Sequence, residues 1–159
     1  MSEPAAPRVF VIQLPAGLEL PNANDRRNRY AQNRLTQAIL AAAWAVALRQ
    51  KVPLLKRVHI VGVHRPVNNR VRDAANMYPS FKACVDGLVK AGVLSNDDDA
   101  HVVGPDMVTG PVDQVAKARK LRHGSLLLVL TELPPLDTAP VVSKSVQRRL
   151  AVQQEADHG

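Results

Sequence analysis

The chain has 159 residues and a mass of 17.3 kDa, enough for one hydrophobic core and too little for two. Hydrophobic residues make up 46% and charged residues 22%, a balance that excludes a largely disordered protein. Aromatic residues make up only 3%, which argues against a surface that stacks single-stranded bases on rings, and the net charge of +7 favours a phosphate-rich partner.

The positive charge is concentrated in the first half of the chain. Residues 1–75 carry twelve Lys or Arg residues against four Asp or Glu residues, a net charge of +8. Residues 76–159 carry nine against ten, a net charge of −1, and they include the run Asn96-Asp97-Asp98-Asp99. A basic half joined to a half with an acidic run suggests a phosphate-binding surface beside a cation site.

Cysteine content and hydropathy indicate the cellular compartment in which we expect the protein. The single cysteine, Cys84, excludes an internal disulfide and a zinc site built on several cysteines, which fits a reducing cytoplasm. The longest apolar run, Ala38–Leu48, has 11 residues, fewer than the ~18 to 20 that a bilayer crossing needs. Met1–Arg8 does not resemble a signal peptide. We therefore expect a cytoplasmic protein, in the host cytoplasm if viral, with no membrane partner.

The first half of the chain predicts a strand and a long helix. Residues 8–14 are rich in β-branched and aromatic side chains and are followed by Pro15, which predicts a strand. Asp25 can cap a helix that runs to about Gln50. Its first turn would hold three cations, which the helix dipole disfavours: Arg26, Arg27 and Arg29. A bound phosphate would remove this conflict; the alternative is a solvated charged face.

The remaining elements follow in the order strand, helix, strand, strand. Residues 56–64 predict a strand with Val58, Ile60 and Gly62 on one face. Asn76 can cap a helix that runs to Ala91, with Gly92 as its stop and Cys84 in its buried stripe. The segment after the acidic run begins as a strand that breaks at Gly104-Pro105, and residues 125–133 predict a central strand. We expect one domain over residues 1–135 and a tail over 136–159, helical near 146–153 or loose.

Carboxylates are the main candidates for chemistry. The chain has no Gly-rich phosphate loop, no serine-nucleophile elbow and no zinc spacing, and its five histidines are scattered, which favours structural or surface roles for them. Asp73 lies in the loop after the second strand, and Asp97–Asp99 lie one helix later. If the helix between them brings the chain back toward the end of the second strand, the two acidic groups can lie close together. They can then supply oxygen ligands for Mg²⁺ or Mn²⁺. Alternatively, Asp97–Asp99 is an exposed turn and Asp73 forms a surface ion pair.

The same segment carries a composite motif. Its elements are Arg72-Asp73, Asn76, Lys82, Asp86-Gly87-Leu88, Ala91-Gly92, Asp98-Asp99 and Val102-Val103. This pattern, over residues 69–103, resembles the central segment of RusA-type Holliday junction resolvases. Weaker similarities are Asn28-Arg29-Tyr30 and a last strand that ends in Thr131-Glu132. One position departs from the pattern, because Ala75 stands where a second Asp is often found.

The resemblance implies an α/β fold, a small mixed sheet of about four strands packed with two main helices. It implies a Mg²⁺-dependent endonuclease, with Mn²⁺ able to substitute, that acts as a homodimer on four-way DNA junctions and makes paired symmetric nicks. Asp73, Lys82 and Asp99 would be catalytic, and Asp73, Asp98 and Asp99 would hold the metal. Asp97, Asp98 or Asp106 could replace the ligand lost at Ala75. The DNA contacts would come from Arg26, Arg27, Arg29, Arg65, Arg70, Arg72 and Asn76.

Two other functions fit the sequence. Ala75 could mark a protein that has lost its metal and only binds branched DNA. The basic charge also fits a general nucleic-acid or ribosome-associated protein with a solvated acidic turn. The sequence does not choose among four-way junctions, flaps and plain duplex as the preferred DNA.

Overall fold

A computed structural model describes residue 3 and residues 5–136, and it confirms a small mixed α/β domain. The predicted tail therefore lies almost wholly outside the described residues. The elements in chain order are β1 (Val9–Gln13), α1 (Arg29–Arg49), β2 (Val58–Arg65), the short 3₁₀ helix η1 (Ala74–Met77), α2 (Tyr78–Lys90), β3 (Val102–Thr109), α3 (Gln114–Ala118) and β4 (Ser125–Glu132).

The four strands form one mixed sheet in the order β1-β4-β2-β3. β4 is antiparallel to both of its neighbours, β1 and β2, so its predicted central place is confirmed. β3 is parallel to β2 and forms an edge of the sheet. Parallel neighbours need a crossover connection, and η1 and α2 supply it. The segments before and after this crossover therefore lie at opposite ends of β2.

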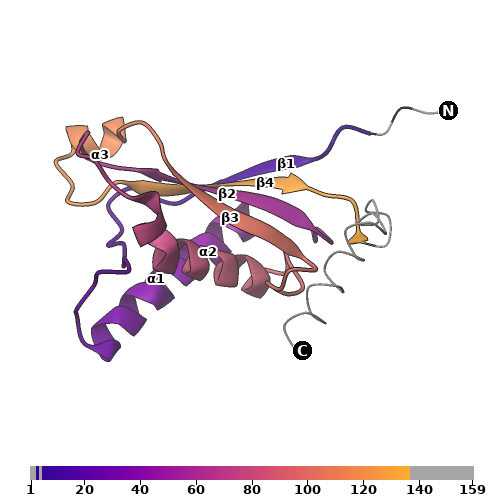
Figure 1. The fold of residues 1–159 in the computed structure, drawn as a ribbon, viewed down its shortest axis with the longest axis horizontal. Coiled ribbons are helices and arrows are strands. Elements are labelled where there is room, and N and C mark those ends of the chain that lie inside the picture. Colours follow the sequence, from indigo (N-terminus) through magenta and orange to yellow (C-terminus); the bar gives the residue numbers. More distant parts are fainter. Residues whose placement is uncertain (1–2, 4, 137–159) are drawn as a thin grey trace, which may run out of the picture.

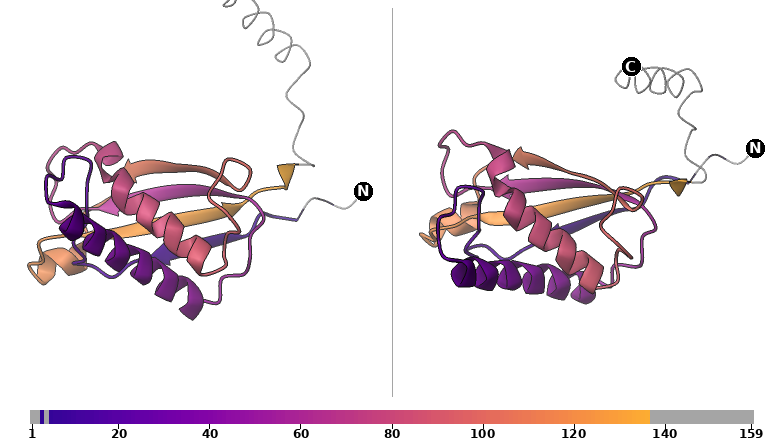
Figure 2. Two further views of the ribbon diagram at one scale, coloured as in Figure 1. Left: turned by 90° about the horizontal axis from the view of Figure 1, so that it is seen from below. Right: turned by 60° about the horizontal axis from the view of Figure 1, so that its bottom comes forward.

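Both long helices pack on the same face of the sheet, as Figures 1 and 2 show. Alternate side chains of β2 and β4 point into this layer and are buried, as the spacing of Val58, Ile60 and Gly62 predicts. A Cβ atom at Gly62 would lie 2.6 Å from the Phe81 ring, so the glycine makes room for the largest core side chain. Cys84 is also buried in this core, and burial raises the pKa of its thiol to about 12.

Two predicted helix starts are wrong. α1 begins at Arg29 and is capped by Asn28, whose side chain accepts from the Ala31 N–H, because the Asp25 carboxylate instead binds Arg27. Of the three early arginines, only Arg29 lies in the helix. α2 begins at Tyr78 after η1, so the predicted cap Asn76 lies inside η1.

Two further features of the chain can be compared with the sequence. The predicted stop at Gly92 is confirmed by its φ of +77°, in the left-handed region that glycine tolerates. The predicted break at Gly104-Pro105 is wrong, because β3 continues through it with a shift in register against β2. None of the helices in the described part of the chain combines the length and apolar character that a membrane crossing requires.

Candidate functional site

Cations from both halves of the chain gather at the end of the sheet where β1 and β2 finish and β4 begins, which we call the basic end. In Figure 1 it lies on the left, with the start of α1, the loop before η1, and α3. The second-half cluster before β4 joins the first-half arginines here, so the charge split along the sequence does not persist in space. The cations are Arg26, Arg27, Arg29, Arg65, Arg70, Arg72, Lys117, Arg119, Lys120 and Arg122.

A cavity of about 430 Å³ opens at the basic end. Its walls come from the loop after β1, the end of β2 with the loop that follows, η1, and the loop before β4. The loop after β1 is held against η1 because the Ala23 N–H donates to the Asn76 carbonyl at 2.8 Å. The lining residues are Leu20, Asn22, Asn24, His64, Pro66, Val67, Val71, Arg72, Asp73, Asn76, Met77, Arg122, His123 and Gly124.

Among the residues that the structure describes, Asp73 is the one carboxylate in this lining. It caps η1, with Oδ1 accepting from the Ala75 N–H at 3.0 Å, and its side chain is exposed. Within residues 5–136 no ion pair engages it. The backbone thus fixes one carboxylate oxygen, and within the described residues no hydrogen bond engages the other.

Arg72 and Asn76, both predicted DNA contacts, line the same cavity as Asp73. One guanidinium nitrogen of Arg72 donates to the Asn68 side chain at 2.6 Å. This hydrogen bond links two parts of the loop before η1. Arg70 is exposed on the outside of this loop. Arg65 lies apart, beside a second cavity that it shares with Arg49 and Asp113.

Two histidines of the cavity were not expected to be functional. The His64 side chain faces the helix layer at the end of β2, its residue is 7% exposed, and its buried Nδ1 has no hydrogen-bond partner within the described residues. Burial, then the charges of Arg72 and His123, lower the pKa of His64 to about 4. Burial also lowers the pKa of His123. Both side chains are therefore neutral at pH 7. One sequence feature could have identified His64 as a buried residue of the site. It follows Val58, Ile60 and Gly62 in the alternating row of side chains that faces the helices.

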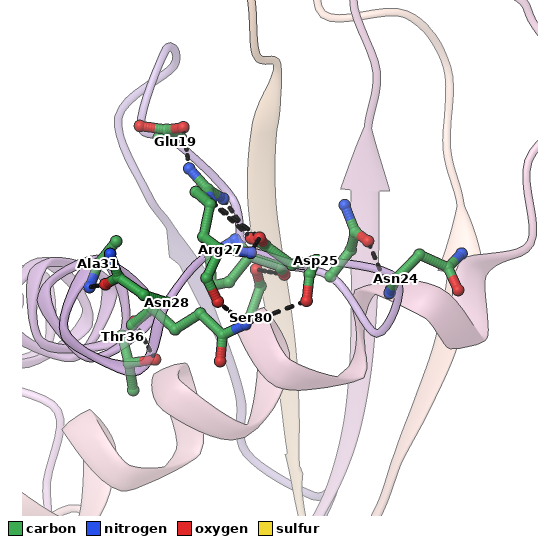
Figure 3. Close-up of polar contacts among 11 residues, drawn as sticks. Glu19, Asn24, Asp25, Arg27, Asn28, Ala31, Thr36 and Ser80 are labelled. Carbon is green, nitrogen blue, oxygen red and sulfur yellow. Dashed lines mark hydrogen bonds and ion pairs between the residues drawn. The ribbon is translucent and has the colours of Figure 1, made fainter.

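Arg27, another predicted DNA contact, is engaged within the chain. Figure 3 shows its guanidinium between the carboxylates of Asp25 and Glu19, with Asn28 beginning the helix beside it. The hydrogen bonds and charge of Arg27 lower the pKa of Asp25 to about 2. Arg27 therefore orders the entry to α1. Arg26 and Arg29 are exposed, and in the described part of the chain they form no ion pair.

The acidic loop, residues 96–101, lies beside the middle of α2 and leads into β3. Lys82 donates to Asp97 at 2.6 Å and also to Asp86. Burial works to lower the pKa of Lys82, but these two hydrogen bonds raise it overall. Asp98 is bound by His101 and by the Asn96 amide, whereas Asp99 is exposed and has no ion pair among the described residues.

The structure does not bring Asp73 together with Asp98 and Asp99 in one chain. The Asp73 cavity is at His64, whereas the acidic loop enters β3 opposite Val58. His64 and Val58 are six residues apart on one strand, or ~20 Å at ~3.3 Å per residue. Among the described residues no three His, Cys, Asp or Glu side chains gather as a metal site would require. Asp106 lies elsewhere again, on the other face of the sheet, bonded to His59 at 2.6 Å.

Comparisons with known proteins do not assign the chain. No protein-family model matches it, and no curated protein matches it. The resemblance of residues 69–103 to RusA-type resolvases thus stays a prediction.

Proposed function

We propose that the protein is a metal-dependent endonuclease that acts on branched DNA, with four-way junctions as the first candidate substrate. One observation carries the proposal. The Asp73 carboxylate, from the motif segment, opens onto a cavity that also holds Arg72, Asn76 and Arg122. A carboxylate among phosphate-binding side chains is the arrangement that a nuclease needs at a scissile phosphate.

The basic end supports binding of DNA through its backbone. Arg26, Arg29 and Arg70 are exposed there, and guanidinium groups bind phosphates without reading base sequence. Such contacts respond to where the phosphates lie, so they suit a substrate recognised by its branched shape.

Residues at the basic end fit one mode of metal binding. Mg²⁺ keeps several waters and is commonly held by one or two carboxylates together with substrate phosphates. The unpaired oxygen of Asp73 fits that mode, and Mn²⁺ takes similar ligands. When bound, the metal would act as a Lewis acid on the phosphate. Asp73 would hold it, and Arg72 with Arg122 would position the phosphate and offset its charge.

Lys82, Asp98 and Asp99 have a less direct place in this proposal. Lys82 already binds two carboxylates, and within one chain the acidic loop enters β3 at the opposite end of β2 from the Asp73 cavity. A metal shared by all three motif aspartates would need a second copy or a rearranged loop. We therefore assign the principal metal ligand to Asp73 and test Asp99 and Lys82 beside it.

A homodimer forms part of the proposal. Resolving a four-way junction requires cuts in two equivalent strands, and a two-fold dimer presents two equivalent sites. Sedimentation of the full chain at micromolar concentration tests this. A stable dimer mass, alone or on the junction, agrees with the proposal, and a monomer in both conditions contradicts it.

Incubating a labelled four-way junction with the protein and Mg²⁺ or Mn²⁺ tests the activity. We expect paired symmetric nicks that Asp73→Asn removes and that the control Asp106→Asn retains. Absence of nicking, or nicking that survives Asp73→Asn, overturns the proposal. Flap and linear duplex substrates in the same assay establish the preference for DNA shape.

A second function, binding branched DNA without cutting it, is favoured by two observations. Ala75 stands in place of a carboxylate, and no group of three potential ligands forms within the described residues. Tight junction binding without metal-dependent nicking, not restored by Ala75→Asp, would select this function. Efficient nicking by the unchanged protein excludes it.

A further inference from the structure

The cavity at the basic end is larger than a phosphate and a metal ion require. Its volume of about 430 Å³ falls within the ~300 to 1,000 Å³ typical of sites for small organic ligands. Its lining also combines charged residues with amide and aliphatic ones. This combination suggests a ligand with an anionic group and a polar organic group.

Charged residues of the lining suit a phosphate. Arg72 uses one guanidinium nitrogen on Asn68 and keeps further N–H donors. Arg122 is exposed, and in the described part of the chain it forms no ion pair. Two guanidinium groups beside one cavity can bind a phosphate through several charge-assisted hydrogen bonds.

The remaining lining suits a sugar and base. Asn24 and Asn76 each carry an amide with both donor and acceptor groups, which is what base edges pair with. Leu20, Val67 and Met77 supply aliphatic walls. Among the described residues no Phe, Tyr or Trp lines the cavity, so a base would be enclosed mainly by aliphatic contact.

His64 is an independent observation that points to a ligand. More than nine-tenths of this residue is buried, it lines the cavity, and its Nδ1 has no hydrogen-bond partner among the described residues. A buried polar atom without a partner costs free energy that a ligand can recover. A neutral imidazole offers one donor and one acceptor, so it can bond to a base or sugar without a charge requirement.

We infer that the cavity binds a single deoxynucleotide, its phosphate against Arg72 and Arg122, its base or sugar against Asn76 and His64. In DNA this nucleotide would be an unpaired one at a branch point, because a base stacked within a duplex cannot reach into a cavity. The inference rests on the proposed action on branched DNA, and it adds which nucleotide the protein selects.

The test is an NMR titration of the full chain, in the presence of a chelator, with a deoxynucleoside 5′-monophosphate. Three fragments are titrated in parallel: the deoxynucleoside, deoxyribose 5-phosphate and inorganic phosphate. We expect amide shifts confined to the cavity lining, a moved His64 ring nitrogen signal, and about tenfold tighter binding of the nucleotide than of any fragment. Equal affinity for inorganic phosphate, shifts elsewhere, or no binding would overturn the inference.

Variants sharpen this test. Arg122→Gln, at an exposed position, should weaken nucleotide binding about tenfold or more, whereas Arg119→Gln, outside the lining, should leave it unchanged. Asn76→Ala should weaken the nucleotide but not inorganic phosphate. His64→Gln is used if its spectrum is folded; if it is not, the His64 ring signal of the unchanged protein provides the measurement. Equal losses in Arg119→Gln and Arg122→Gln contradict a specific cavity.

The final comparison uses DNA. A junction with one unpaired nucleotide at the branch should bind several-fold tighter than a fully paired junction, and Arg122→Gln should remove that difference. No preference for the unpaired nucleotide contradicts the inference. Because these measurements need no metal, nucleotide binding can succeed where nicking fails, and nicking can succeed where nucleotide binding fails.

Discussion

The basic end and the acidic loop contain aspartates of the same motif in opposite surroundings. At the basic end, Asp73 is exposed beside arginines and a cavity. In the acidic loop, Asp97 is bound by Lys82, and Asp98 by His101 and Asn96. Among the described residues of that loop, only Asp99 has a carboxylate without an ion pair. The capacity to hold a ligand therefore depends on which carboxylates the fold leaves unpaired, and proximity in the sequence does not decide it.

The largest expected effect is on nicking. Asp73→Asn should reduce metal-dependent nicking of a four-way junction by about 100-fold or more, because it removes the carboxylate charge that would hold the metal. Asp99→Asn should have a much smaller effect. Single-turnover rates with matched protein concentrations measure both. If Asp99→Asn abolishes nicking and Asp73→Asn does not, the roles of the two regions are reversed.

The pH dependence of the free energy of unfolding distinguishes the basic end from the acidic loop. His64 has its pKa lowered from 6.5 to about 4, so the unfolded chain takes up its proton first and stability falls as pH drops from about 6.5 toward 4. Between pH 8 and pH 5 this amounts to about 2 kcal/mol. The lowered pKa values of Asp97 and Asp98 act only below about pH 4. Urea unfolding at pH 8 and pH 5 measures the loss, which His64→Gln should reduce; an unchanged loss in that variant contradicts the assignment.

DNA affinity should depend on the basic end. Arg70→Gln and Arg29→Gln should each weaken junction binding several-fold and lower the slope of log affinity against log salt concentration by about 0.9. Lys90→Gln, on the last turn of α2, serves as the matched control. Binding titrations at several salt concentrations give the slopes. Equal losses of junction affinity in all three variants would show that DNA binding depends on net charge and not on the position of the cations.

The smallest effect is expected at Lys82. Its ion pairs with Asp86 and Asp97 are partly exposed, so Lys82→Met should lower the free energy of unfolding by less than about 1 kcal/mol. High salt should reduce the difference further. Urea unfolding of the variant measures it. A severe loss of nicking with this small loss of stability would instead place Lys82 at the reacting phosphate.

Much of the fold could be predicted from the sequence because local patterns and packing agree. The alternation of Val58, Ile60 and Gly62 gave the inward face of β2, and Gly92 gave the end of α2. The helix start predicted from Asp25 is wrong because a neighbouring cation, Arg27, competes for the Asp25 carboxylate. The strand break predicted from Pro105 is wrong because β3 is an edge strand, where a missing backbone N–H can be tolerated.

The candidate site was predicted only in part, for a reason of topology. Asp73 and Asp97–Asp99 were expected to meet because a helix returns the chain. That helix instead connects two parallel strands, so it must carry the chain from one end of β2 to the other. Strand direction was not readable from periodicity. His64 and Arg122, from distant segments, join the site only through the pairing of β2 with β4.

We propose that the metal binds at Asp73 rather than at the acidic loop. Line broadening by Mn²⁺ tests it most directly, through the amide signals of the full chain bound to a short branched DNA. We expect broadening to begin at Arg72, Asp73 and Asn76 and at residues 122–124, which line the cavity. Broadening that begins at residues 96–101 and spares the cavity would contradict it.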